Sequence, residues 1–219
     1  MADDPNSPLD DPAADPVPRP VRRRPKPGER RREILEALAT MLEQPGAERV
    51  TTAALAARLQ VSEAALYRHF ASKAQMFEGL IEFIEQSIFG LINQITEREQ
   101  AVPDGVSGPR QASYIVTKLL QFAERNPGMT RVMVGDALVF ENERLQQRMN
   151  QFFDKIEATL RQALRVSASA EGSLTPSVDS QIAAATLTAF ALGRLHRFAR
   201  SGFKRLPTEH LEASLVRML

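Results

Sequence analysis

The sequence contains no cysteine and no tryptophan among its 219 residues, and only two tyrosines. Without cysteine the chain can form neither a disulfide framework nor a thiolate metal site, and nothing marks it as secreted. The N-terminal region lacks an apolar stretch that could act as a signal peptide, and no apolar run approaches the roughly 18 residues that cross a bilayer. We therefore expect a cytoplasmic protein without a membrane span.

Strand patterns and internal repeats are also lacking. Hydrophobic residues nevertheless make up 43% of the chain, enough for one sizeable core or for a small domain packed on a larger one. Apolar residues recur at three- and four-residue spacing along most of the sequence, as they do in amphipathic helices. The sequence therefore predicts an all-α fold of nine or ten helices.

The net charge of +1 hides an uneven distribution along the chain. Residues 1–18 carry five Asp and no base, residues 19–73 carry twelve Lys or Arg against six Glu, and residues 74–219 carry sixteen of each sign. The basic surplus thus lies in one segment, which indicates an anionic partner such as nucleic acid.

Composition predicts three regions. Residues 1–28 hold eight of the fourteen prolines and almost nothing that could form a core, so we expect a disordered tail. Its basic part, from Arg19, is interpreted either as a solubilising extension or as an arm that lies along DNA phosphates. The rest of the chain is predicted to divide into a smaller helical domain over residues 29–73 and a larger helical domain over residues 74–219.

Caps, prolines and glycines delimit the expected helices. The first follows Gly28 and ends near residues 44–46, the second is capped by Thr51 or Thr52, and the third is capped by Ser62 and runs to Phe70. A capping box at residues 72–75 begins a long fourth helix. Loops are expected at 101–109 and 167–177, and residues 126–128 should stop a helix. The remaining helices are expected over 110–125, 145–164, 175–200 and 208–219, with one or two shorter turns of helix over 129–140.

The stretch TTAALAARLQVSEAALYRHFASK, residues 51–73, has the spacing of a helix-turn-helix motif. Apolar residues at 55, 59, 61, 66 and 70 would face inward, so that the second helix of the motif juts outward. In the usual geometry the first residues of that helix reach base edges in the major groove, while caps and hydroxyls hold phosphates. The helix N-terminus adds partial positive charge and free amides.

The candidate DNA-binding residues divide by hypothesised role. Phosphate contacts are assigned to polar groups at helix ends, namely Thr51, Thr52, Tyr67, His69 and Lys73. Base discrimination is assigned to the exposed part of the second helix, namely Ser62, Ala64, Ala65 and Arg68, with an alanine against a thymine methyl. An ordinary half-buried helix end is the alternative interpretation for Tyr67 and His69.

The pattern VSxxALYRHFxSKxxMF at residues 61–77, together with the helix before it, resembles the DNA-binding domain of TetR-family transcriptional regulators. The resemblance covers residues 30–77 and implies an all-α homodimer, in which three N-terminal helices bind DNA and a larger helical domain dimerises, often around a ligand pocket. From Arg30 onward, and notably in FAERNPGMTRVMVGDALVFENERL, the chain resembles the nucleoid occlusion branch of that family. This implies binding to palindromic chromosomal sites in the nucleoid and antagonism of FtsZ assembly.

Two functions remain open. The polar stretch ERNPGMTR could offer Glu124, Arg125, Asn126 and Arg131 to a protein partner, which the resemblance identifies as FtsZ. A solvated helix terminus explains the same residues equally well on physical grounds. The alternative function is a ligand-responsive repressor, which would need polar groups inside an apolar pocket. The candidates for those groups are Thr117, Thr186 and Thr188.

The sequence gives no indication of an enzyme. His69, His196 and His210 are far apart, no Asp or Glu stands at metal-ligand spacing to any of them, and a Gly-rich phosphate loop is lacking. We therefore expect no catalytic residue, cofactor or metal.

A homodimer is expected to form through the last two long helices, over 181–200 and 208–219. Small residues would allow close packing, and leucines would supply apolar area. The small residues are Ala183, Ala184, Ala185, Ala189 and Gly193, and the leucines are Leu187, Leu192, Leu195, Leu211 and Leu215. Two DNA-binding domains related by a two-fold axis imply a palindromic site with half-sites about one helical turn apart.

Overall fold

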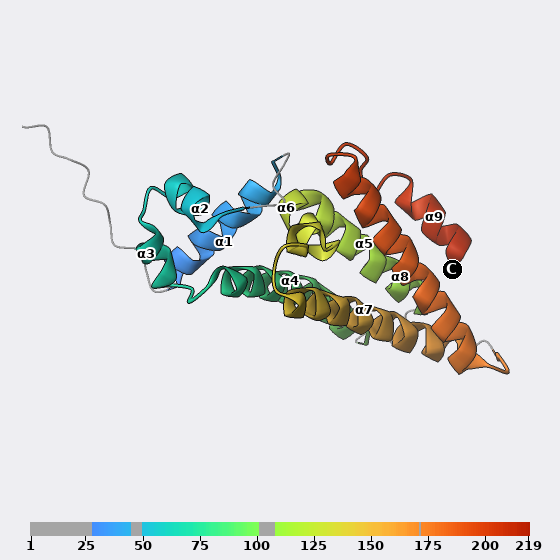
Figure 1. Cartoon of the computed structure of the whole chain (residues 1–219). Coiled ribbons are helices and arrows are strands. Elements are labelled where there is room, and N and C mark those ends of the chain that lie inside the picture. The colour runs from blue at the N-terminus through green and yellow to red at the C-terminus, as the bar shows by residue number, and fades with distance from the viewer. Residues whose placement is uncertain (1–27, 45–49, 101–107, 171) are drawn as a thin grey trace, which may run out of the picture.

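The computed structural model describes residues 28–44, 50–100, 108–170 and 172–219 (Figure 1). Within these ranges all regular secondary structure is helical, in nine α-helices and one short 3₁₀ segment, which confirms the predicted all-α fold. The predictions made for residues 1–27 and for the loop at 101–107 lie outside the described residues.

The first three helices and the start of the fourth form one end of the molecule (Figure 1). They are α1 (Glu29–Leu42), α2 (Thr52–Arg58), α3 (Glu63–Tyr67) and α4 (Lys73–Gln100). We call this part, residues 28–73, the head. Its core consists of fully buried apolar side chains, including Ile34, Leu38, Leu55, Leu66 and Phe70. Leu59 and Val61, expected inside, are only partly buried because they lie in the turn between α2 and α3.

The remaining helices form a larger helical body. They are α5 (Gly108–Arg125), α6 (Pro127–Met133), the 3₁₀ segment η2 (Asp136–Leu138), α7 (Glu143–Ala170), α8 (Pro176–Arg200) and α9 (Leu211–Met218). The long helices α7 and α8 pack side by side, and α5 packs against both (Figure 1). The expected apolar face of α7 is buried throughout, at Leu145, Met149, Phe152, Phe153, Ile156, Leu160 and Leu164.

Several helix ends differ from the sequence prediction. α3 ends at Tyr67 and not at Phe70, and α5 begins at Gly108, inside the loop expected at 101–109. The loop expected at 167–177 is wrong in its first part, because α7 continues through Ala170. The hydroxyl of Ser169 donates to the carbonyl of Arg165 at 2.9 Å, so a serine expected in a loop is accommodated by the helix backbone. At the C-terminus, α9 begins at Leu211 and not at residue 208, since His210 has a left-handed backbone with φ of 53°.

Gly128 joins the head to the body. The sequence prediction treated this glycine as part of a helix stop, but it lies inside α6, and Asn126 alone separates α5 from α6. A Cβ atom at Gly128 would stand 1.9 Å from the carbonyl oxygen of Ala39 in α1. The position therefore requires glycine because two helix backbones approach each other closely there.

Four of the five leucines expected at a dimer interface lie instead in the core of the single chain, and the fifth, Leu192, is half-buried. Leu187, Leu195, Leu211 and Leu215 are buried, as is Ala184, and all five belong to the hydrophobic cluster that runs from α1 to α9. Their assignment to intermolecular contacts is therefore wrong. The exposed face of α8 carries other residues at helical spacing, namely Val178, Ile182, Thr186, Ala189 and Gly193.

None of the helices in the described ranges is long and apolar enough to cross a bilayer.

Candidate nucleic-acid interface

Two hydroxyl caps position the helices of the motif. The Oγ1 atom of Thr51 accepts the amide hydrogen of Ala54 at 3.1 Å and starts α2, and the Oγ atom of Ser62 accepts that of Ala65 at 3.2 Å and starts α3. Both caps were predicted. Each hydroxyl accepts through oxygen in these contacts, so its own hydrogen remains available to donate to a phosphate.

The turn between α2 and α3 is closed by backbone hydrogen bonds. Val61 N–H donates to the carbonyl of Ala56 at 3.0 Å, and Gln60 N–H donates to that of Ala57 at 3.1 Å. This is the pattern of a Schellman motif, with Gln60 in the left-handed position at φ of 54°, where glycine is usual. The turn thereby sets the angle at which α3 leaves the head.

Arg31 fixes the far end of α3. Its Nη1 atom donates to the carbonyl of His69 at 2.7 Å, and its guanidinium carbon lies 4.2 Å from the centroid of the Phe70 ring. Sequence reasoning missed this residue, because 38 positions separate Arg31 from His69 and no local pattern links them. Arg31 therefore supports the position of the motif as well as contributing positive charge.

Thr52 and Tyr67 lie together on the outer surface of the motif. The Thr52 hydroxyl donates to Oε2 of Glu63 at 2.6 Å, and the Tyr67 hydroxyl lies at 3.5 Å from Oγ1 of Thr52. Tyr67 is 44% exposed, so the half-buried alternative does not describe it well. Glu63 was not among the candidates, although it occupies the first position of α3 and its carboxylate holds the hydrogen that Thr52 would give to a phosphate.

The other candidates on α3 face solvent. Ala64, Arg68 and His69 are exposed, and Ala65 is half-buried. Within the described part of the chain, neither Arg68 nor the His69 ring has a side-chain hydrogen bond or an ion pair. The surface of α3 is thus open to a groove of DNA.

Lys73, the expected phosphate clamp, is engaged within the chain. Its ammonium group forms an ion pair with Glu141, in the segment between η2 and α7. The Glu141 side chain is only 9% exposed and that of Lys73 30% exposed. The pair links the head to the body and holds the lysine away from an external phosphate.

The charge of the folded head is nearly balanced. Residues 29–73 carry seven Lys or Arg against six Glu, because five of the twelve basic residues in 19–73 precede α1. Within the described residues, positive potential at the motif therefore comes mainly from the helix N-termini and Arg68.

The four candidate partner residues around the α5–α6 junction differ in accessibility. Glu124 accepts a hydrogen bond from the Thr208 hydroxyl, and Nδ2 of Asn126 donates to the carbonyl of Phe122 at 2.7 Å. The guanidinium of Arg131 lies 5.3 Å from the centroid of the Phe203 ring. Arg125 is exposed and has no such contact in the described residues.

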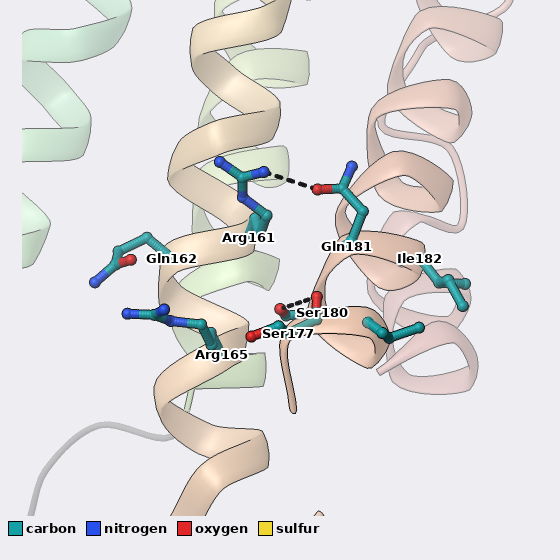
Figure 2. Close-up of a pocket in the computed structure, with 8 residues that line it drawn as sticks. Arg161, Gln162, Arg165, Ser177, Ser180, Gln181 and Ile182 are labelled. Carbon is teal, nitrogen blue, oxygen red and sulfur yellow. Dashed lines mark hydrogen bonds between the residues drawn. The ribbon is translucent and has the colours of Figure 1, made fainter. Parts of the chain in front are cut away.

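The candidate threonines for a ligand pocket differ in their surroundings. The Thr186 hydroxyl donates to the carbonyl of Ile182 at 2.8 Å, within its own helix, and the buried Thr188 hydroxyl has no partner in the described residues. The groove of about 470 Å³ between α7 and α8 is an open surface feature lined by Arg161, Arg165 and Gln181, among others (Figure 2). It does not include Thr117, Thr186 or Thr188.

The described residues also contain no group of three His, Cys, Asp or Glu that could hold a metal ion.

A capped helix-turn-helix head on a larger helical body defines the class of helix-turn-helix DNA-binding regulators. Family models divide the chain in the same way. The model for bacterial regulatory proteins of the tetR family matches residues 34–80, and the model for a tetracyclin repressor-like, C-terminal domain of SlmA-like type matches residues 110–218. The chain belongs to the TetR family and, within it, to the SlmA nucleoid occlusion factors.

Curated relatives support this placement over both parts of the chain. The nucleoid occlusion factor SlmA of Vibrio vulnificus strain YJ016 is 53% identical over 188 residues, which is 85% of this chain and 92% of that protein. The protein of the same name from Vibrio cholerae is 53% identical over 184 residues, covering 84% and 90%.

Solved structures show the same fold at low identity. The transcriptional regulator FadR from Bacillus subtilis, in complex with stearoyl-CoA, aligns with a TM-score of 0.66 at 14% identity, over 85% of this chain and 96% of that one. The regulator PfmR from Thermus thermophilus aligns with a TM-score of 0.66 at 22% identity, again over 85% and 96%.

Proposed function

We propose that this chain is a nucleoid occlusion factor that binds palindromic chromosomal sites as a homodimer and, when bound, antagonises FtsZ assembly over the nucleoid. The observation that carries the proposal is 53% identity to nucleoid occlusion factors over 85% of the chain, through head and body alike. The location that follows is the cytoplasm, in association with the nucleoid. The proposed division is a basic arm before α1, a DNA-binding part over 29–73, and a dimerisation and partner-binding part over 74–219.

The proposed DNA contacts follow the geometry of α2 and α3. Thr51 and Ser62 donate from the caps to phosphates, while Ala64 and Arg68 face the bases. Thr52 and Tyr67 reach a phosphate together once Thr52 leaves Glu63, since their hydroxyls already share one surface. His69 adds a backbone contact at the end of α3. Lys73 joins them once it leaves Glu141, and Ala65 lies at the edge of the base-reading surface.

The proposed homodimer uses the exposed face of α8. Val178, Ile182, Thr186, Ala189 and Gly193 follow one another at three- and four-residue spacing and project from the body. Small residues at the end of this stripe allow a second copy of α8 to approach closely. An isologous contact of this kind presents two heads to successive turns of DNA.

Arg125 is the residue of the α5–α6 junction best placed to meet FtsZ, because it is exposed and unpaired among the described residues. We expect Arg125→Asp to abolish the effect on FtsZ polymers and to leave the affinity for operator DNA unchanged. The measurement is sedimentation of GTP-assembled FtsZ with the variant and a palindromic duplex. Arg144→Asp is a matched control, since Arg144 is exposed at the start of α7 and has no ion pair in the described residues. Retained activity of Arg125→Asp would remove this residue from the contact.

Genome-wide mapping of bound sites tests the function as a whole. Palindromes scattered over the chromosome but absent near the replication terminus are expected of a nucleoid occlusion factor. A single site beside a transporter gene would support the ligand-responsive repressor instead.

A further inference from the structure

The C-terminal end of α8 and the chain beyond it carry a concentration of positive charge. Residues 194–219 contain six Lys or Arg and two Glu, whereas residues 74–193 contain ten Lys or Arg and fourteen Asp or Glu. The charges of residues 74–219 are balanced in number, but the C-terminal end of this range is basic and the rest of it is acidic. A surface of this kind attracts an anionic partner.

The connection between α8 and α9, residues 201–210, is held in a defined conformation. The Ser201 hydroxyl oxygen accepts the amide hydrogens of Lys204 at 3.1 Å and Arg205 at 2.9 Å. Gly202, Phe203 and His210 have left-handed backbones with φ of 62°, 65° and 53°. A bulky residue such as Phe203 adopts this conformation only where its surroundings enforce it.

Side chains of the body enforce the conformation. The Phe203 ring meets Phe198 edge to face at 5.1 Å between centroids, and the Arg131 guanidinium lies 5.3 Å from the Phe203 centroid. Arg194 donates to the carbonyls of Pro207 and Glu209. Burial, followed by the nearby charge of Arg197, lowers the pKa of Arg194, while Glu209 acts in the opposite direction. The connection is thus preorganised, so little ordering entropy is lost when a partner binds it.

The connection presents a basic groove. The groove has a volume of about 560 Å³ and is lined by three basic residues, one acidic residue, Thr208 and the 46% exposed Leu206; the charged residues are Arg197, Lys204, Arg205 and Glu209. Arg197 is paired with Glu209 at 3.1 Å. Lys204 and Arg205 are exposed, and among the residues described neither side chain has an ion pair or a hydrogen bond. Two unneutralised cations beside an apolar side chain suit a segment that combines acidic and apolar residues.

The groove adjoins the α5–α6 junction and lies away from α3. The Thr208 hydroxyl donates to Glu124, and Arg131 contacts Phe203, so the two segments share one side of the body. The whole length of α1 and α6 separates this side from α3 (Figure 1). An α-helix of 14 residues such as α1 is about 21 Å long. A protein that contacts Arg125 can reach the groove more readily than DNA seated on α3.

We propose that Lys204 and Arg205 form a second docking surface, continuous with Arg125, for an acidic segment of the protein partner. The inference rests on the proposed function and extends its partner site from the α5–α6 junction to the α8–α9 connection. The attraction is electrostatic, so the contact weakens as the salt concentration rises.

The test is the double variant Lys204→Glu/Arg205→Glu in the full chain, bound to a palindromic duplex, with FtsZ as the probe. We expect the dissociation constant for FtsZ to rise about tenfold, since two exposed attractions become repulsions. The operator affinity and the dimeric state should not change. The control is Arg144→Glu/Lys155→Glu, which alters the net charge equally at two exposed positions of α7 and should retain FtsZ binding. Light scattering, fluorescence anisotropy on the duplex and size-exclusion chromatography supply the three readouts.

Each outcome bears on the inference. Unchanged FtsZ binding by the double variant overturns it and leaves the proposed function intact. If the double variant binds the operator more weakly, Lys204 and Arg205 contact DNA; if it no longer dimerises, they belong to the dimer interface. Either result overturns the inference. If the unaltered chain itself fails to bind FtsZ, the proposed function falls and the inference falls with it.

Discussion

Gly128→Ala tests whether the close approach of α1 and α6 sets the stability of this protein. The added Cβ would lie 1.9 Å from the carbonyl oxygen and 2.8 Å from the carbonyl carbon of Ala39, both backbone atoms that cannot rotate away. Separation of the helices would disturb Ile34, Leu38 and Leu42, which are at most 1% exposed. Overpacking of this kind costs about 3 kcal/mol at the upper end of its usual range.

Helix propensity offsets part of that cost. Alanine is favoured over glycine by up to about 1 kcal/mol inside a helix, so the net loss should be about 2 kcal/mol. For a chain of this length the melting temperature should fall by about 4–8 °C. Urea unfolding followed by circular dichroism measures the free energy directly, at one fixed protein concentration because the proposed homodimer would dissociate on unfolding.

Gly90→Ala is the matched control. Gly90 lies within α4, is exposed, and would have nothing within 4 Å of an added Cβ. That variant should gain up to about 1 kcal/mol from helix propensity alone. If Gly128→Ala were as stable as Gly90→Ala, the two helix backbones could not be in the contact described, and the reasoning would be refuted.

Three further predictions concern DNA binding. Tyr67→Ala should weaken operator binding roughly fivefold without lowering the melting temperature, whereas Thr40→Ala, which removes a hydroxyl bonded to its own helix, should have no effect. Glu141→Gln should release Lys73, raise the operator affinity about threefold and steepen the dependence of log K on log salt by about 1; an unchanged slope would exclude Lys73 as a phosphate contact. Deletion of residues 1–27 should flatten that slope if the basic arm touches phosphates, while deletion of residues 1–18, which removes only the acidic part, should not.

Most helix boundaries followed from local chemistry. Thr51 and Ser62 begin their helices as predicted because a cap satisfies amides only three residues away. Ser72 also caps α4, although the Gln75 side chain reaches back to the amide of Ala71 and not to that of the serine. Ser201 and Gly202 end α8 as expected.

Candidate site residues were harder to predict where their partners are remote. The surface positions of Arg68 and His69 follow from helical spacing, and so does the burial of Phe70. The ion pair of Lys73 with Glu141 does not, because 68 positions separate the two residues. Arg125 was expected on the surface and is exposed, while the neighbouring Arg131 lies over the ring of Phe203, far along the chain.

By itself the sequence determined that this protein is all-helical, where its motif begins, and which faces of α4 and α7 are apolar, since these depend on periodicity and on neighbours within a few residues. Tertiary structure alone decided that Gly128 serves a helix contact and that Leu187 and Leu195 belong to the core of one chain. It also brought the connection between α8 and α9 against the α5–α6 junction, through Thr208 with Glu124 and Phe203 with Arg131. The physical reason is that a side chain's burial and partners depend on which helices meet, and helices distant in sequence meet only in the folded chain.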